Sequence, residues 1–188
     1  MFDIHIEENS LSLSKLPNFN QIKDEISLFS QYDRVIFCTM GKSAFACRKL
    51  VYTARSYGLE WHDLDVCHAF HGDAGIIKPN DLLVFVSKSG ETKETVAVAN
   101  YFDNWESIAI TSNKDSILNK ICKNEIVIPV KTECSPFGFA PMISTSMYMI
   151  VLHGILCETV IGKGLTIEEY AKNHPAGKIG KDLKDAIS

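Results

Sequence analysis

One stretch of the chain determines the expected fold, because it joins an apolar run to a loop of small polar residues. It reads Leu82-Leu83-Val84-Phe85-Val86 and continues Ser87-Lys88-Ser89-Gly90-Glu91-Thr92. Five consecutive apolar residues with branched and aromatic side chains predict a strand buried on both faces. Helical spacing follows from Glu94 to Phe102. The stretch therefore predicts a strand–loop–helix unit of a parallel sheet.

The same alternation continues on both sides of this unit. Further strands are expected at 35–38, 60–66, 107–111 and 125–130, and helices at 19–29, 43–54, 115–122, 144–161 and from 166 onward. The tail from His174 to Gly180 is not expected to form regular helix. The pattern predicts an α/β fold, a three-layer α-β-α sandwich around a mainly five-stranded parallel sheet of Rossmann-like or flavodoxin-like type. We expect one domain over 1–188, with a helical segment at 1–33 and the core and tail at 34–183.

The composition of the chain argues against nucleic acid and membranes as binding partners. The 188 residues are 46% hydrophobic and 22% charged, with a net charge of −4, which is typical of a globular protein without a basic nucleic-acid surface. The first residues lack the basic start and apolar run of a signal peptide, so none is expected. The apolar stretch at 147–156 is interrupted and is expected to be too short to cross a bilayer. We therefore expect a cytoplasmic protein that binds neither nucleic acid nor membrane. The six cysteines form no C-x-x-C pair and are expected to be free thiols, several of them in the core.

The loop after the central strand can be interpreted in two ways. The hydroxyls of Ser87, Ser89 and Thr92 can bind phosphate oxygens, Gly90 allows close backbone approach, and the next helix offers free N–H groups. Alternatively, Ser89 caps the helix, with Thr92 or Glu94 in its first turn. The spacing alone leaves both interpretations open.

Two other loops carry candidate residues at the same edge of the sheet. The segment Met40-Gly41-Lys42-Ser43 ends like a nucleoside-triphosphate loop, but the earlier glycine of that motif would fall at Ile36, inside a strand. Lys42 is either a cation for a phosphate or oxyanion, or a solvated lysine. His71 is either a proton-transfer group or an exposed turn residue.

The remaining polar residues carry weaker local signals. Taken alone, Glu133 is interpreted as a surface carboxylate and His174 as a tail residue. Gly162 and Gly164 are expected to end a helix. Four potential metal ligands follow no standard zinc spacing, so no metal site is expected: His62, His68, His71 and Asp73.

Taken together, five segments resemble the sugar isomerase (SIS) domain, and within it the arabinose-5-phosphate isomerase family. The resemblance runs from about Arg34 to Leu183. In chain order the segments are Met40-Gly41-Lys42-Ser43; His71-Gly72-Asp73 with Gly75; Ser87-x-Ser89-Gly90-Glu91-Thr92; Glu133 with Pro136-x-Gly138-x-Ala140-Pro141; and His174-Pro175-x-Gly177.

The resemblance implies a cofactor-free isomerase that interconverts ribulose 5-phosphate and arabinose 5-phosphate through an enediolate. The product would feed synthesis of 3-deoxy-manno-octulosonate for lipopolysaccharide or capsule. By resemblance, the phosphate is bound by Ser43, Ser87, Ser89, Gly90 and Thr92. The implied catalytic residues are His174, Glu133, His71, Lys42 and Glu91. His174 is the first choice for proton transfer, Glu133 or His71 the next, and Lys42 stabilises oxygen charge; the base itself, histidine or glutamate, stays open.

The resemblance also implies an assembly. The C-terminal histidine of this fold usually reaches a neighbouring subunit's site, so a homotetramer is expected. Many family members carry two C-terminal CBS modules, whereas this sequence stops at Ser188, so regulation through them is expected to be absent. Departures from the family at Thr39, His68 and Met142 bear on which sugar fits. The alternatives are an isomerase of another sugar phosphate and a non-catalytic sugar-phosphate sensor; the five filled polar positions favour catalysis.

Overall fold

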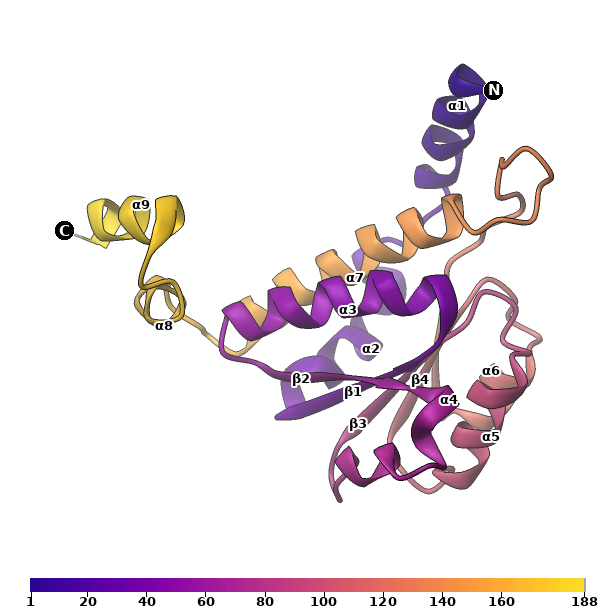
Figure 1. Ribbon diagram of the computed structural model, residues 1–188, viewed down its shortest axis with the longest axis horizontal. Helices are drawn as coiled ribbons and strands as arrows, with labels where there is room; N and C mark the ends of the chain where they lie inside the picture. Colours follow the sequence, from indigo (N-terminus) through magenta and orange to yellow (C-terminus); the bar gives the residue numbers. More distant parts are fainter. Residues whose placement is uncertain (188) are drawn as a thin grey trace.

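Five parallel strands form the centre of the molecule, in the order β2-β1-β3-β4-β5. The computed structural model describes residues 1–187. In register, Val35 pairs with Trp61 on one side and with Leu82 on the other. The expected all-parallel α/β sheet is confirmed (Figure 1), with strands at β1 Arg34–Thr39, β2 Glu60–Asp65, β3 Leu82–Val86, β4 Ser107–Thr111 and β5 Asn124–Val127.

Helices cover both faces of the sheet, because the buried strands alternate apolar side chains between the two sides. Phe37 of β1 packs in one cluster and Cys38 in the other. The first face carries α2 (Phe19–Gln31), α3 (Gly41–Ser56) and α7 (Ile143–Gly162). The second carries α4 (Val66–Ala69), α5 (Lys93–Tyr101) and α6 (Ile117–Ile121), with the 3-10 turn η1 (Asp73–Ile76) following α4. The expected three-layer arrangement is confirmed.

The most apolar helix, α7, lies against the sheet rather than apart from it. By length and composition alone its 20 residues could cross a membrane, so the expectation that this stretch is too short was wrong on length. Met147, Tyr148 and Leu152 are buried in the cluster that α7 shares with α2 and α3. Its composition is therefore that of a core helix of this fold.

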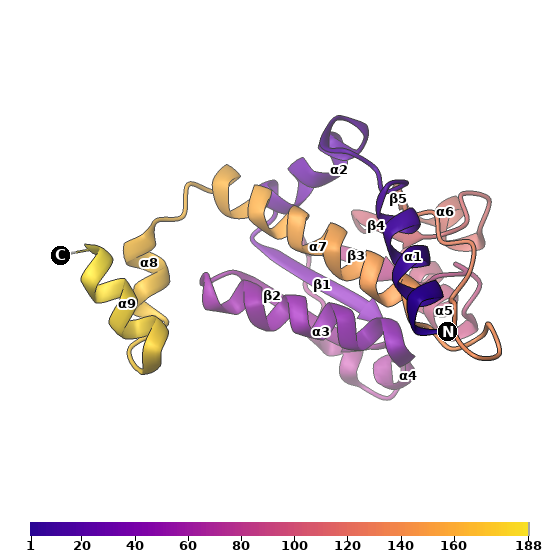
Figure 2. The same cartoon turned by 90° about the horizontal axis from the view of Figure 1, so that it is seen from above.

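Both ends of the chain extend beyond the sandwich (Figures 1 and 2). Helix α1 (Phe2–Leu13) touches α7, whereas α8 (Ile167–Lys172) and α9 (Gly177–Ile187) pack on each other. We refer to residues 166–187 as the C-terminal arm. The expectation that the tail to Gly180 is non-helical was wrong from Gly177 onward. Gly177 starts α9 with φ +74°, and Gly180 is buried where a Cβ would collide with the carbonyl of His174.

Candidate functional site

A polar cavity of about 270 Å³ lies where the strand order reverses, between β1 and β3. Helices α3 and α5 follow these two strands on opposite faces of the sheet, so their N-termini meet at its carboxyl edge. The cavity is lined by Met40, Ser43, Val86, Ser87, Lys88, Ser89, Thr92 and Thr95. We refer to this cavity with its loop 87–92 as the cradle.

Two open helix N-termini face the cradle. The N-caps of α3 and α5 are Met40 and Thr92, and neither makes a side-chain hydrogen bond to the first turn. First-turn N–H groups and two helix dipoles therefore point towards a site suited to an anion. The Ser89-cap alternative was wrong: α5 begins at Lys93, and the Ser89 hydroxyl instead accepts from the Glu91 amide at 3.1 Å. Glu94 does lie in the first turn.

Hydrogen bonds within the loop fix its shape before any ligand binds. The hydroxyls of Ser87 and Thr92 lie 2.9 Å apart, and the Gly90 amide donates to the Ser87 carbonyl and hydroxyl oxygens at 3.1 and 3.2 Å. Gly90 has φ +66°, and a Cβ there would collide with Ser116. The packing of the loop therefore requires glycine at position 90. Ser89 is exposed and lies at the mouth of the cavity.

Thr95 is a residue of this cavity that the sequence interpretation missed. It is fully buried in the first turn of α5, and its hydroxyl has no hydrogen-bond partner. An unpaired buried hydroxyl bordering a polar cavity is a site for a ligand or water atom. The spacing of Thr95 could have indicated its place in the site. It lies three residues after Thr92 of the loop motif, and residues three apart share a helix face.

Glu133 lies next to the cradle and is buried, so the interpretation as a surface carboxylate was wrong. Its side chain is 2% exposed. One carboxylate oxygen, Oε2, accepts from the amides of Met142 and Ser144 at 2.9 and 3.1 Å, at the start of α7. The other, Oε1, lies 2.6 Å from Nζ of Lys88, the second residue that was missed. Burial raises the pKa of Glu133, but Lys88 and the Ser144 and Met142 hydrogen bonds outweigh it and lower the pKa overall.

Three further predicted residues do not line the cavity. Lys42 is exposed in the first turn of α3, and His71 is exposed in the turn after α4. The Glu91 carboxylate accepts from the Ile117 amide at 3.0 Å and so points to the start of α6. Lys42 and Glu91 thus lie beside the cradle. The expectation that His71 lies at this sheet edge was wrong, because the preceding Phe70 packs against Tyr101 at the C-terminal end of α5, whereas the cradle contains the N-terminal end of that helix. The catalytic roles of all three residues stay predictions.

His174 is not brought to the cradle within one chain. Its ring lies 4.1 Å from that of Tyr170, whose ring lies 4.6 Å from Tyr57 just after α3, and Asn173 donates to the Ser56 carbonyl at 3.2 Å. The arm is thus held at the C-terminal end of α3, whereas the cradle contains its N-terminal end. A 16-residue helix is about 24 Å long, and Figure 2 shows the arm projecting away from the sandwich.

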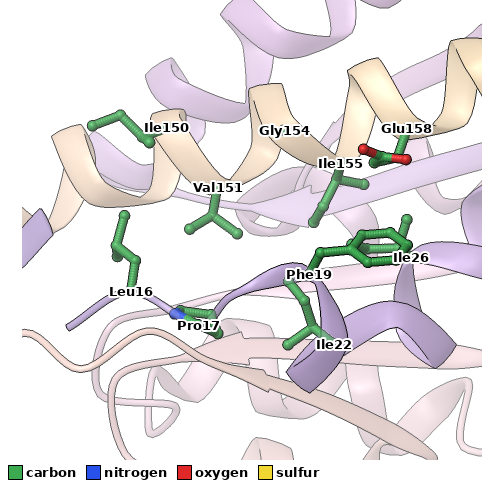
Figure 3. Close-up of a pocket in the computed structure, with 10 residues that line it drawn as sticks. All are labelled: Leu16, Pro17, Phe19, Ile22, Ile26, Ile150, Val151, Gly154, Ile155 and Glu158. Carbon is green, nitrogen blue, oxygen red and sulfur yellow. The ribbon is translucent and has the colours of Figure 1, made fainter. Parts of the chain in front are cut away.

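A second cavity, of about 220 Å³, has a different chemistry. It lies between α7 and the segment leading into α2, and apolar side chains such as Ile22, Val151 and Ile155 point into it (Figure 3). Glu158 places a negative charge at the border of this cavity, so the cavity is not suited to an anion. Among residues 1–187, no three His, Cys, Asp or Glu side chains gather as a metal-binding group.

Comparison with known proteins identifies the family. The family model of the SIS domain, which describes its sequence pattern, matches residues 28–156. The chain belongs to the SIS domain family. It is 33% identical over 156 residues to the arabinose 5-phosphate isomerase KpsF of Escherichia coli, covering 82% of this chain and 49% of KpsF. It is 29% identical over 164 residues to arabinose 5-phosphate isomerase KdsD of Yersinia pestis, covering 86% of this chain and 50% of KdsD.

A solved structure extends the similarity to the three-dimensional fold. The structure of an Escherichia coli CFT073 protein in complex with arabinose 5-phosphate superposes with a TM-score of 0.86 at 26% identity, covering 93% of this chain and 95% of that one. The chain spans about half the length of the curated relatives that it matches.

Proposed function

We propose that this SIS-domain chain is an aldose–ketose isomerase that interconverts D-ribulose 5-phosphate and D-arabinose 5-phosphate. The observation that carries the proposal is the cradle, where two uncapped helix N-termini converge on a cavity lined with hydroxyl groups. Such a site suits a phosphate monoester. The names of KpsF and KdsD, and the ligand of the Escherichia coli CFT073 protein, support a pentose phosphate as the bound sugar.

In this proposal the cradle binds the phosphate and leaves the sugar carbons at its mouth. The expected ligands are Ser43, Ser87, Ser89 and Thr92, with the loop shape set by Gly90. Thr95 adds a hydroxyl that lacks a partner in the described structure. Because the phosphate does not change during the reaction, these contacts contribute equally to substrate and transition-state binding.

The isomerisation moves a proton between C1 and C2 and shifts a proton between the two oxygens. It needs a base, an acid and a group that stabilises the enediolate oxygen. His174 is the preferred proton-transfer residue, because both oxygens of Glu133 are already engaged and its lowered pKa makes it a weaker base. Lys42 stabilises the oxygen charge, and Glu91 completes the polar surroundings. The role proposed for His71 needs a second chain, because His71 does not lie at the cradle of its own chain.

The distance along α3 favours a site built from two chains. We expect His174 to reach the cradle of a neighbouring subunit in a homotetramer, because within one chain the arm is held at the opposite end of α3. The reaction uses no cofactor. We expect it to take place in the cytoplasm, with the product used to make 3-deoxy-manno-octulosonate for lipopolysaccharide or capsule.

The decisive experiment incubates the purified protein with ribulose 5-phosphate in D₂O and identifies products by NMR. We expect arabinose 5-phosphate carrying deuterium at C2, because the proton that the base removes from C1 exchanges with solvent before the enediolate is protonated at C2. Heat-inactivated protein is the control. No arabinose 5-phosphate at high enzyme concentration would contradict the proposal. Exchange confined to other sugar phosphates would indicate a different isomerase, and a thermal shift without any exchange would indicate a sensor.

A further inference from the structure

Lys88 lies between two parts of the site that are far apart in sequence. It comes from the loop that follows β3, and its side chain borders the cradle together with Ser87 and Ser89. Its Nζ lies 2.6 Å from Oε1 of Glu133, 45 positions further along the chain by residue number. The backbone of Lys88 is itself anchored, because its carbonyl accepts from the Ser112 amide at 2.9 Å after β4. The ammonium group is thus carried by a fixed part of the sheet edge.

Glu133 depends on this contact because its carboxylate is almost fully buried. The two amide donors at the start of α7 both act on Oε2, which leaves Oε1 to Lys88. The Nζ–Oε1 contact is a close charge pair rather than a well-aligned hydrogen bond. Without the ammonium group, one carboxylate oxygen would be buried with no compensating charge, which favours either protonation or movement of the carboxylate.

We propose that Lys88 is a positioning residue, which holds Glu133 ionised and fixes the loop that carries it against the phosphate-binding loop. The inference rests on the proposed isomerase function, because it assigns Lys88 a role in that same site. The phosphate-binding loop, Glu133 and the N-terminus of α7 then form one unit. A displacement of the loop that carries Glu133 would otherwise alter the sugar end of the site while leaving the phosphate contacts in place.

Direct phosphate binding by Lys88 is the competing role. The geometry disfavours it, because the ammonium charge is already paired with a buried carboxylate at 2.6 Å. The two roles differ kinetically. A phosphate ligand contributes to uniform binding, so its loss raises KM, whereas a positioning residue acts on reaction geometry, so its loss lowers kcat.

The charges near Glu133 determine how the pH profile should change. Lys88 faces it from the loop after β3 and Tyr148 from α7, and His5 of α1 lies 3.4 Å from the adjacent Cys134 carbonyl. Lys88 lowers the pKa of Glu133, so removing the ammonium group raises that pKa. The acid limb of activity should therefore move to higher pH in Lys88→Met.

The test compares the native protein with Lys88→Met and Lys88→Arg, and with Lys23→Met on α2 as a control for the loss of one exposed positive charge. For Lys88→Met we expect kcat to fall about 10- to 100-fold, with KM nearly constant and the acid limb displaced upward. Lys88→Arg should keep the acid limb at its native position, and Lys23→Met should leave both parameters as they are. A raised KM with native kcat and an unmoved acid limb would overturn the proposal.

A measurement without substrate separates this inference from the proposed reaction. Protein labelled with ¹³C at glutamate carboxyls is titrated by NMR, and the Glu133 resonance is identified by its loss in Glu133→Gln. We expect the Glu133 midpoint to move to higher pH in Lys88→Met. An unmoved midpoint overturns the inference, even if the native protein is an isomerase. Failure of the native protein to convert ribulose 5-phosphate would contradict the proposed function alone, and this titration would still decide the coupling.

Discussion

The cradle and the C-terminal arm both carry predicted site residues, but they are held in opposite ways. The cradle loop is closed by hydrogen bonds among Ser87, Gly90 and Thr92. It is tied to the sheet edge because the Ser87 amide donates to the Ile110 carbonyl of β4. The arm meets the sandwich through Tyr57, Ser56 and a few neighbours at the end of α3. The cradle is therefore preformed in one chain, whereas the proposed role of His174 requires a second chain to bring it to a cradle.

This contrast separates binding from turnover. Phosphate affinity should depend on the cradle alone, because its donors are in place before the ligand arrives. Turnover should depend on both regions, because proton transfer requires a group within hydrogen-bond reach of the sugar carbons. Changes in the cradle and in the arm should therefore give different kinetic results.

The largest effect is expected from His174→Ala. Turnover should fall about 10²- to 10⁴-fold, because a positioned proton-transfer group is lost. Phosphate-sugar binding and thermal stability should stay close to native, since the side chain lies on the arm. Steady-state kinetics and a thermal shift with arabinose 5-phosphate measure the two quantities. Unchanged turnover would remove His174 from the mechanism.

A mixing experiment tests whether His174 acts across subunits. Co-expression of His174→Ala with Lys42→Ala gives mixed assemblies in which one chain can supply the histidine and another the lysine. Activity above that of either variant alone is expected if each site uses residues of two chains. Lack of any gain would argue that His174 acts within its own chain.

The next effect compares two glycines at close contacts, one in each region. Gly90→Ala should lower the free energy of unfolding by about 2–4 kcal/mol, because the new Cβ adopts positive φ and collides with Ser116. Gly180→Ala meets the His174 carbonyl in the arm, so it should change global stability by less than about 1 kcal/mol while lowering turnover. Urea denaturation of both variants checks the comparison, and equal losses of stability would contradict it.

Ser89→Ala should have a smaller effect on binding. We expect KM to rise about 10-fold with kcat nearly native, since a hydroxyl bound to the phosphate contributes equally before and during the reaction. Ser10→Ala on α1 is the matched control. A fall in kcat with native KM would show that Ser89 acts on the sugar carbons instead.

Glu91→Gln should give the smallest change. The amide oxygen can still accept from Ile117, and only the favourable charge at the start of α6 is lost, which costs about 0.3–1 kcal/mol. Denaturation measures this cost, and kcat is measured on the same sample. A more than 10-fold fall in kcat would support the catalytic role predicted for Glu91, whereas native kcat would leave it as a helix-capping residue.

The parts of the fold with local causes were predictable from sequence. The central strand matches Leu82–Val86, and Gly164 adopts φ +64° at the end of α7. Helix α8 follows Thr166 as expected, and the structure adds a capping box between Thr166 and Glu169. Helix α5 starts at Lys93, one residue before the expected Glu94, and the alternative of a Ser89 cap was wrong because Ser89 hydrogen-bonds locally within the loop. The fifth strand ends at Val127, although the Ile128 amide still donates to Thr111.

Relations between distant segments were not predictable. Nothing near Glu133 in sequence indicates that it will be buried under α7 or paired with Lys88, because both partners come from other parts of the chain. The spacing of Thr95 from Thr92 was visible in the sequence, but the sequence does not show that its hydroxyl is buried without a hydrogen-bond partner. The separation of His174 from the cradle follows from the length of α3. It could not be predicted, because the sequence does not show that the arm contacts the C-terminal end of this helix.

Because α3 contacts the cradle at one end and the arm at the other, its length sets the distance between these two regions. Its first turn borders the cradle at Ser43, and its last residues, Ser56 and Tyr57, hold the arm. One inserted residue would shift the arm by about 1.5 Å and rotate it by about 100° about the helix axis. Surface loops can lengthen without this penalty. Among related chains, the length of α3 should therefore stay constant where loop lengths vary.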